Sequence, residues 1–253
     1  MILVKNILKK YDNKKVVNDV SVNIEKGKIT SFIGPNGAGK STLLSIITRL
    51  MKRDLGEVYI EGKEISQWDK KELSKKIAIL KQSNNLNMRL TIRELVSFGR
   101  FPYCEGRLTE EDEKFVDDAI EYMNLVDIQN KYLDELSGGQ RQRAFIAMAL
   151  AQKSEILFLD EPTTYLDIYH QVEILELVKE LNEESKLTVV MVLHDINQAI
   201  KYSDNVIVMK SGQVISSGRA NEVINMDLLN NVYKIGGFIN EMETETVFVP
   251  LKL

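Results

Sequence analysis

The chain has 253 residues, a formal net charge of −4 and a charged fraction of 28%. These values are ordinary for a soluble globular protein, and the slightly acidic balance argues against nucleic acid as the main partner. A single cysteine, Cys104, excludes an intramolecular disulfide and a cysteine-based zinc cluster. No run approaches about 18 apolar residues and no signal-peptide core follows Met1, so we expect a cytosolic chain that reaches a membrane only through a partner.

The first predicted strands cover residues 2–8 and 16–24, the second because its apolar and polar side chains alternate. Tyr11 lies between them in a polar turn with Asp12 and Asn13. This tyrosine is either an ordinary surface residue of the turn or a platform for a nucleotide base, since such stacking contributes roughly 1–3 kcal/mol. The turn alone does not decide between these interpretations.

The next stretch matches a phosphate-binding loop. An apolar strand predicted over residues 29–33 leads into G-x-x-x-x-G-K-[ST], made here by Gly34, Pro35, Asn36, Gly37, Ala38, Gly39, Lys40, Ser41 and Thr42. In this motif backbone N–H groups surround the phosphates, the lysine reaches the β- and γ-phosphates, and the serine hydroxyl binds Mg²⁺. A helix with an apolar inner face follows, and its N-terminus favours anions. The sequence therefore predicts a nucleoside triphosphate site, with Lys40 exposed to solvent when the loop is empty.

Residues 56–60 predict a strand that returns to an antiparallel part of the fold. A short charged helix over residues 69–76 then leads into a compact apolar strand at 77–80. Gln82 comes two residues after that strand, so we expect it beside the strand's carboxyl end.

Strand signals are absent from the following region, which predicts a helical insert over about residues 85–152. Helices are predicted at 91–99 and 109–123. Thr109 and Asp112 have the spacing of a capping box, in which each side chain bonds the backbone N–H of the other residue. This spacing supports a helix start at Thr109.

The insert ends in a second candidate anion site. Residues 136–143 run into an apolar helix, for which Ser137 is a good N-cap. Gly138 and Gly139 let a ligand approach the backbone closely, and Gln140 follows them. This helix start has neither a lysine nor a magnesium ligand. It is therefore either an ordinary capped helix or half of a site whose other half lies elsewhere.

Residues 156–159 are apolar throughout, as expected for a parallel strand that is buried on both faces. Asp160 and Glu161 follow at the strand end. Adjacent carboxylates can have different chemical roles. Here Asp160 would support Mg²⁺, and Glu161 would position or deprotonate a water. The alternative is a solvated acidic turn, which so apolar a strand makes less plausible.

A turn over residues 163–167 precedes a helix predicted from 168 to 184. His170 lies on this helix, and we interpret it as a surface or partner-facing residue. A further apolar strand at 189–193 is followed at once by His194. A lone histidine after a strand is usually structural, so its role depends on its neighbours.

Four polar positions share one feature of the predicted sheet. Gly34, Gln82, Asp160 and His194 each follow an apolar strand immediately or within two residues. In a parallel sheet, ligands bind outside the carboxyl ends of the strands. We therefore expect an α/β fold in which these positions converge around the γ-phosphate.

With these motifs in this order, the chain resembles the ATP-binding subunit of ABC transporters over nearly its full length. Walker A corresponds to residues 34–42, the signature to Leu136–Gln140, Walker B to Ile156–Glu161 and the D-loop to Leu166-Asp167. Tyr11 falls where the family places its adenine-stacking aromatic. The resemblance implies a P-loop NTPase of the ABC ATPase type, with a parallel-sheet core, an antiparallel β part and the helical insert.

The resemblance also implies one nucleotide-binding domain over residues 1–253. Its C-terminal extension, about residues 236–253, is too short for the regulatory domain that some sugar importers carry.

The family further implies which residues bind and hydrolyse ATP with Mg²⁺. Glu161, His194, Lys40 and Gln82 are the catalytic candidates. Ser41, Gln82 and Asp160 are the metal candidates, Asp160 through a water. Two chains are expected to form a head-to-tail dimer in the ATP-bound state. Each ATP then lies between one Walker A loop and the other chain's signature, so that Ser137, Gly138, Gly139 and Gln140 act in trans beside the D-loop residue Asp167.

A narrower resemblance is to the importers of ferric siderophores, haem and vitamin B12. It is carried by Phe98–Pro102, Leu166–Gln171 and His194–Ala199, and the siderophore branch is the most similar. It implies an ATPase that powers iron–siderophore uptake, with haem, vitamin B12 or a metal ion as alternative cargo. The partners implied are transmembrane permease subunits and, indirectly, an extracytoplasmic substrate-binding protein. The chain is then peripheral to the cytoplasmic face of the cell membrane, with no nucleic acid partner.

Two non-transport classes of the same superfamily fit less well. A DNA-repair ATPase needs a long coiled-coil insertion between Gln82 and Ser137, and no sustained heptads occur there. An ATPase of translation usually carries tandem cassettes, whereas each motif occurs once in this chain.

The aromatic stretch of Phe98, Phe101, Pro102 and Tyr103, with Arg100 beside it, leaves two interpretations open. It either packs the core of the insert or borders a groove for a short helix of the membrane subunit.

Overall fold

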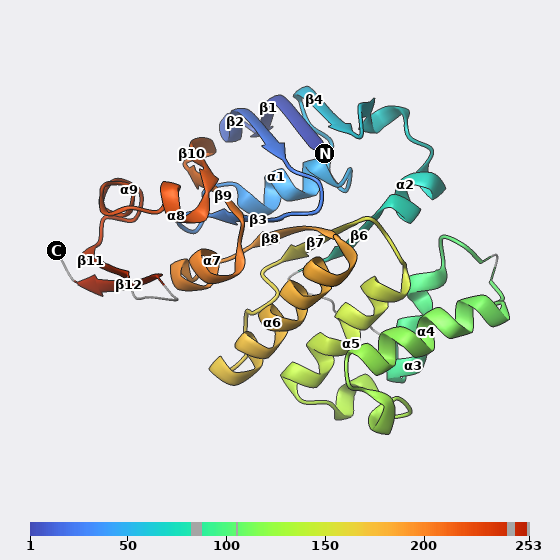
Figure 1. Cartoon of the computed structure of the whole chain (residues 1–253). Helices are drawn as coiled ribbons and strands as arrows, with labels where there is room; N and C mark the ends of the chain where they lie inside the picture. Colours follow the sequence, from blue (N-terminus) through green and yellow to red (C-terminus); the bar gives the residue numbers. More distant parts are fainter. Residues whose placement is uncertain (82–87, 105, 242–245, 252–253) are drawn as a thin grey trace. The chain divides into compact units, whose positions relative to one another are not determined.

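The computed structural model describes residues 1–81, 88–104, 106–241 and 246–251, in which helices alternate with parallel and antiparallel strands (Figure 1). The predicted α/β class is thereby confirmed. The chain divides into two compact units, which are described separately. The first comprises residues 1–68 and 178–253, and the second comprises residues 69–177.

An antiparallel sheet in the first unit contains the N-terminal strands. Its order is β2-β1-β4-β5, with bounds β1 Ile2–Tyr11, β2 Lys14–Ile24, β4 Leu55–Ile60 and β5 Lys63–Glu64. A short 3₁₀ helix, Ile65–Gln67, follows β5. Tyr11 is the last residue of β1 and pairs with Lys14, so it does not lie in the turn itself as predicted. The turn consists of Asp12 and Asn13, and Asp12 has a positive φ of 51° that asparagine and aspartate tolerate.

A second group of strands in this unit is built around β3 (Ile29–Ile33), which pairs in parallel with β8 (Thr188–Val192) and β9 (Asn205–Lys210). β10 (Gln213–Arg219) pairs antiparallel with β9. All five residues of β3 and of β8 are buried, and both strands are mainly apolar, although Thr30, Ser31 and Thr188 are buried with them. Helix α1 (Lys40–Ile47) follows β3 and buries the apolar face that the sequence predicts.

The C-terminal part of the first unit was not predicted in detail. It contains α7 (Ile196–Tyr202), α8 (Ala220–Val223), α9 (Met226–Tyr233) and a hairpin of β11 (Gly236–Glu241) and β12 (Thr246–Leu251). The Asn197 side chain on α7 holds the hairpin. Its Nδ2 donates to the Phe248 carbonyl oxygen at 3.1 Å, and its Oδ1 accepts from the Phe248 N–H at 2.7 Å.

The second unit contains two parallel strands, β6 (Ile77–Leu80) and β7 (Ile156–Asp160), and the helices that lie between them in the chain. These are α3 (Ile92–Ser97), α4 (Glu110–Tyr122), α5 (Gly138–Ala151) and the 3₁₀ turns Phe98–Arg100, Val126–Ile128 and Leu133–Glu135. Helix α2 (Lys70–Lys76) precedes β6, and α6 (Ile168–Ser185) begins after β7. No strand interrupts the described residues between β6 and β7, in line with the predicted helical character.

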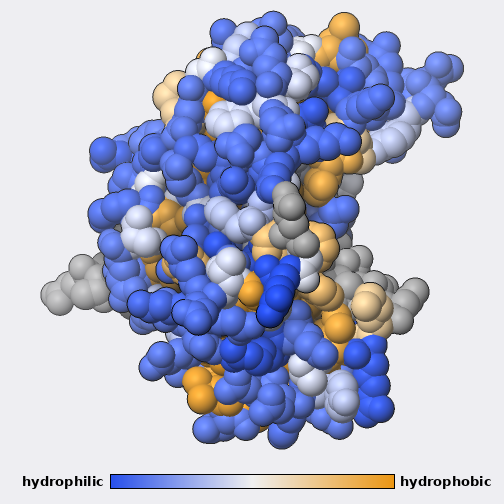
Figure 2. Space-filling view, turned by 90° about the vertical axis from the view of Figure 1, so that its right-hand side faces the viewer, coloured by the Kyte–Doolittle hydropathy of each residue, from blue (hydrophilic) through white to orange (hydrophobic). Residues whose placement is uncertain are grey.

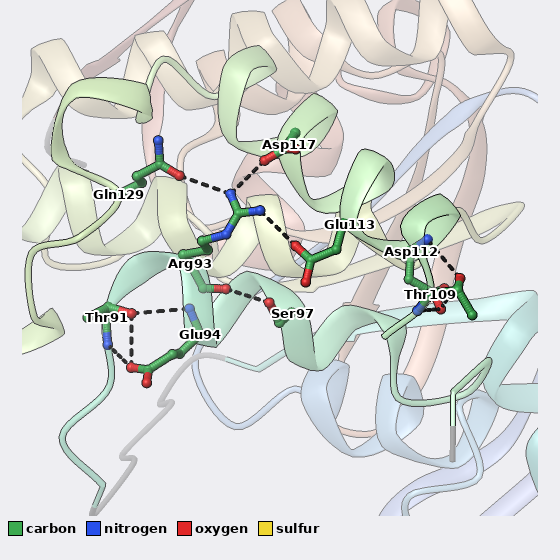
Figure 3. Close-up of polar contacts among 9 residues, drawn as sticks. All are labelled: Thr91, Arg93, Glu94, Ser97, Thr109, Asp112, Glu113, Asp117 and Gln129. Carbon is green, nitrogen blue, oxygen red and sulfur yellow. Dashed lines mark hydrogen bonds and ion pairs between the residues drawn. The ribbon is translucent and has the colours of Figure 1, made fainter. Parts of the chain in front are cut away.

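Capping boxes start α3 and α4 (Figure 3). Thr109 caps α4 and bonds reciprocally with Asp112, as predicted, and Thr91 caps α3 with Glu94 in the same way. Arg93 then links α3 to α4. Its guanidinium binds Glu113 at 2.7 Å and Asp117 at 2.5 Å, and its side chain stays one-third exposed (33%).

Arg100 forms a second and deeper ion pair. Its Nε lies 2.9 Å from Oδ1 of Asp112, and its Nη1 donates to the Ala151 carbonyl oxygen at 2.8 Å. Arg100 and Asp112 are only 4% and 5% exposed. Although burial acts in the opposite direction, hydrogen bonds from Thr109 and Arg100 hold the pKa of Asp112 below its ordinary value. Arg100 is therefore a packing residue of the insert and not an exposed anchor.

Replacing Arg100 by leucine should lower the free energy of unfolding by about 3 kcal/mol or more, because it leaves the buried Asp112 carboxylate without its cation. Urea unfolding at pH 7 measures this change. Arg93→Leu is the matched control, and it should cost about 1 kcal/mol or less because the Arg93 pairs are partly exposed. Equal losses for the two variants would contradict the structural role given to Arg100.

No helix among the described residues has both the length and the apolar character needed to cross a membrane. The face of the molecule shown in Figure 2 is mostly hydrophilic, with hydrophobic residues in separate patches.

Candidate functional site

The Walker A loop owes its glycines to positive backbone angles and to close neighbours. The φ angles of Gly34, Gly37 and Gly39 are 144°, 77° and 99°. A Cβ atom at Gly34 would lie 2.0 Å from the Met209 carbonyl oxygen, and one at Gly39 would lie 2.5 Å from the Val16 carbonyl oxygen. The loop can therefore form only where these side chains are absent.

The Walker A loop also forms a hydrogen bond with the turn between β9 and β10. The Gly212 N–H donates to the Ala38 carbonyl oxygen at 3.0 Å, and the Asn18 N–H donates to Gly212 at 2.8 Å. Asn36 and Gly37 are exposed at the tip of the loop, whereas Gly39 is buried where the loop enters α1. The loop is thus confined by strands β2 and β9 and by the turn after β9, which the sequence motif does not mention.

Lys40 is buried, with only 5% of its surface exposed, so the prediction of a solvent-exposed lysine is wrong. Its Nζ donates to the carbonyl oxygens of Gly34 at 2.7 Å and Pro35 at 3.2 Å. A buried ammonium needs acceptors, and the loop itself supplies them. Ser41 and Thr42 follow on α1 and are half-buried.

His194 reaches the same sheet edge as the loop. Phe32 of β3 is in register with Val192 of β8, and the Leu193 N–H donates to the Phe32 carbonyl oxygen at 3.1 Å. Gly34 and His194 therefore each stand two residues beyond a matched pair of parallel strands, as expected from the sequence. The His194 side chain is exposed.

Tyr11 is 46% exposed at the end of β1. Its hydroxyl donates to the Met51 sulfur at 3.1 Å, which fixes one end of the ring. The Lys9 ammonium lies 5.8 Å from the ring centre. The tyrosine is thus a partly exposed aromatic surface of the first unit.

In the second unit, Asp160 is the last residue of β7 and Glu161 follows in a left-handed conformation with φ of 55°. The Thr164 hydroxyl donates to Oε2 of Glu161 at 3.1 Å. Tyr165, in the turn that follows, also has a positive φ, of 65°. Both carboxyl groups are half-buried, which does not support the alternative of a fully solvated acidic turn.

Ser137 is the N-cap of α5, as predicted. Its hydroxyl accepts from the Gln140 N–H at 3.3 Å, and the Gln140 side chain accepts from the Ser137 N–H at 3.1 Å. Ser137 and Gly138 are exposed, whereas Gly139 is buried. The first N–H groups of a helix have no acceptor within it, so this exposed end can receive an anion.

The D-loop residue Asp167 is exposed but bound to its own helix. Its Oδ1 accepts from the His170 N–H at 3.0 Å and lies 2.8 Å from Nδ1 of the same residue. These bonds hold the pKa of Asp167 below its ordinary value. His170 is half-buried, with 27% of its side chain exposed, and its role as a partner-facing residue stays a prediction.

Gln82 lies outside the described residues. Within the part of the chain that the structure describes, no group of three or more His, Cys, Asp or Glu side chains could hold a metal ion. Ser41 and Asp160 carry hard oxygen atoms of the kind that Mg²⁺ prefers.

Sequence reasoning missed the residues that shape the site from a distance. Val16, Met209 and Gly212 confine the Walker A loop, and His170 packs beside the signature. The Ser211-Gly212 dipeptide is a turn signal, but no local pattern says what the turn contacts.

Comparisons with known proteins agree with this arrangement. A family model described as ABC transporter matches residues 17–164. The petrobactin import ATP-binding protein YclP of Bacillus subtilis (strain 168) is 54% identical over 249 residues, covering 98% of this chain and 99% of that protein. The ferric enterobactin transport ATP-binding protein FepC of Escherichia coli (strain K12) is 41% identical over 225 residues, covering 88% and 83%. A dimeric ATP-binding cassette bound to ADP and Pi is 37% identical, with a TM-score of 0.77, covering 87% of this chain and 99% of that chain.

Proposed function

Because the chain belongs to the ABC transporter family and is an ATPase, we propose that it powers an importer of iron–siderophore complexes. The observation that best supports an iron–siderophore cargo is the near full-length similarity to a petrobactin import ATP-binding protein. The similarity to an enterobactin transport protein supports the same class of iron chelate. Haem, vitamin B12 and metal ions remain the alternative cargoes.

Within one chain, we assign the phosphates to the Walker A loop. Its backbone N–H groups and the Lys40 ammonium bind the β- and γ-phosphates, and the Tyr11 ring stacks on the adenine. Ser41, Gln82 and Asp160, the last through a water, would hold Mg²⁺, which when bound neutralises phosphate charge. Glu161 orients or deprotonates the attacking water, and His194 contacts the γ-phosphate.

The exposed start of α5 supports a shared site. Ser137 and Gly138 are exposed at the start of this helix, which carries no lysine there, as expected for half of a phosphate site. We therefore propose a head-to-tail homodimer in which residues 137–140 of one chain bind the ATP held by the other, with Asp167 beside them. The dimeric state of the similar cassette supports this assembly. We also propose that residues 1–253 form one domain. Its helical insert covers about residues 85–152, and its C-terminal extension covers about residues 236–253.

The proposed assembly places the chain at the cytoplasmic face of the cell membrane as a peripheral subunit. Permease subunits cross the membrane, and an extracytoplasmic binding protein delivers the cargo to them. ATP binding closes the dimer and hydrolysis reopens it, so that the attached permease alternates its access.

Uptake by cells tests the cargo. A strain lacking this chain should lose most uptake of a radioiron-labelled siderophore and recover it when the wild-type chain is supplied. Uptake of haem and of vitamin B12 in the same strain should be unchanged. Loss of haem or vitamin B12 uptake with siderophore uptake intact would replace iron chelates by that alternative cargo.

Some residues of the aromatic stretch pack the core of the insert, and others are exposed and available to a membrane subunit. Tyr103 is half-buried, and its ring centre lies 4.0 Å from the Arg100 guanidinium, so it packs the insert. Phe98 and Phe101 are 37% and 65% exposed and meet edge to face with ring centres 6.3 Å apart. We propose that this exposed pair contacts the permease.

Phe101→Asp should then uncouple siderophore uptake from ATP hydrolysis, because a charge replaces an apolar anchor at the interface. ATP binding by the isolated chain should be unchanged. Ile215→Asp introduces the same charge at an exposed apolar position of β10 and serves as the control. Normal uptake and assembly with substitutions at both Phe98 and Phe101 would assign the pair to packing alone.

A further inference from the structure

The second glycine of the signature has a neighbour within its own chain. A Cβ atom at Gly139 would lie 2.2 Å from Cδ2 of His170 and 2.7 Å from its Cγ. Real Cβ atoms do not approach so closely, so any side chain at this position would displace the imidazole ring. Gly139 is therefore required by the packing of α5 against His170, in addition to any contact with a nucleotide.

The same imidazole is bound to the D-loop. Nδ1 of His170 lies 2.8 Å from Oδ1 of Asp167, and the His170 N–H donates to that oxygen at 3.0 Å. The next residue, Gln171, donates from Nε2 to the Leu166 carbonyl oxygen at 2.8 Å. Both residues of the D-loop are thus held by side chains in the first turn of α6.

Helix capping explains part of this arrangement. Asp167 precedes α6 and accepts the backbone N–H of its third residue, as N-cap residues do. A cap stabilises its own helix, but it does not require a ring packed on another helix. Here the ring also meets Gly139 of α5, and Arg143 of α5 pairs with Glu173 of α6 at 3.1 Å.

We propose that His170 is a positioning residue that fixes the D-loop relative to the signature. One face of its ring packs on Gly139, and Nδ1 holds the Asp167 carboxylate. The start of α5 and the residues before α6 are thereby presented to a second copy of the chain as one preassembled surface. This inference rests on the proposed head-to-tail dimer, because only a partner chain would bind that surface.

The test measures ATP-dependent dimerisation of the full-length chain in a Glu161→Gln background, where hydrolysis does not reverse assembly. His170→Leu removes the hydrogen-bond donor, whereas His170→Asn keeps an N–H donor near the position of Nδ1. Glu180→Leu makes a polar-to-leucine change at an exposed position farther along α6 and is the control. Dimerisation is followed by sedimentation with ATP. ATP affinity of the monomer and Tm are measured for every variant.

His170→Leu should weaken dimerisation about 10-fold or more, as expected for a lost hydrogen bond to a carboxylate. His170→Asn should restore most of that loss, and Glu180→Leu should match the parent. Monomer ATP affinity should stay unchanged.

Dimerisation of His170→Leu equal to the parent would overturn the inference while leaving the proposed function intact. A parallel fall in Tm and monomer ATP affinity would overturn it in favour of a folding role. Failure of the Glu161→Gln parent to dimerise would overturn the proposed dimer and this inference with it.

A second measurement tests the packing of Gly139. Gly139→Ala should lower Tm when His170 is present, because the added methyl displaces the ring. In a His170→Ala background the same change should raise Tm, since alanine favours a helix over glycine. Equal Tm changes in the two backgrounds would show that the ring and the glycine are not coupled, and would overturn the inference.

Discussion

A Glu161→Gln chain should keep its affinity for ATP and hydrolyse it about 10²–10⁴-fold more slowly, the usual contribution of a general base. This factor corresponds to roughly 3–5 kcal/mol of activation free energy. The glutamine has nearly the same shape, so it should retain the position that Glu161 takes after β7 beside Thr164. Only the capacity to take a proton from water is removed.

A phosphate-release assay measures turnover, and a titration calorimeter measures ATP affinity. Because the bound ATP persists, the variant should run as a dimer on size exclusion with ATP and as a monomer without it. Glu155→Gln, one residue before β7 and paired with Lys76, is the control and should leave turnover unchanged. Turnover of Glu161→Gln within a few-fold of wild type would remove the assigned role.

The second large effect is expected at Lys40. Lys40→Ala should reduce ATP affinity about 10- to 100-fold, which is the 1.5–3 kcal/mol of a hydrogen bond to a charged group. In the structure, the ammonium donates to the Gly34 and Pro35 carbonyl oxygens. ATP would replace these neutral acceptors by anionic phosphate oxygens, which attract an ammonium more strongly. Wild-type affinity in the variant would contradict the central assignment.

Two comparisons make the Lys40 result specific. Lys28→Ala, at the opposite end of β3, removes a lysine paired with Asp204 and should leave ATP affinity unchanged. Mixing Lys40→Ala chains with Ser137→Arg chains should restore part of the hydrolysis that each lacks, because one shared site of the mixed dimer is intact. Circular dichroism should show that all these chains are folded.

Local signals in the sequence predicted the elements that carry the site. β6 and β7 are short and largely apolar because strands buried on both faces hold few polar side chains. The caps at Thr109 and Ser137 were predicted because they depend on residues three positions apart. Such patterns can be read without knowledge of the tertiary structure.

The features that the sequence did not predict concern side chains whose contacts are set by the folded backbone or by distant residues. Lys40 was expected in solvent because the motif does not say that the loop carbonyls will accept its protons. The contact between His170 and Gly139 was not predicted because the two residues are 31 positions apart in the sequence. The hairpin of β11 and β12 depends on Asn197, which no periodicity connects with Phe248.

The Asn197 side chain also protects one edge of the β11–β12 hairpin from pairing with strands of other chains. A two-stranded hairpin has two edges, and an exposed strand edge is a template for adding a strand from another molecule. Phe248 points its N–H and carbonyl away from β11, and Asn197 occupies both. Pro250, two residues on, faces the same edge and has no N–H to offer. One amide and one proline therefore blunt this edge against intermolecular sheet growth, a common first step of aggregation.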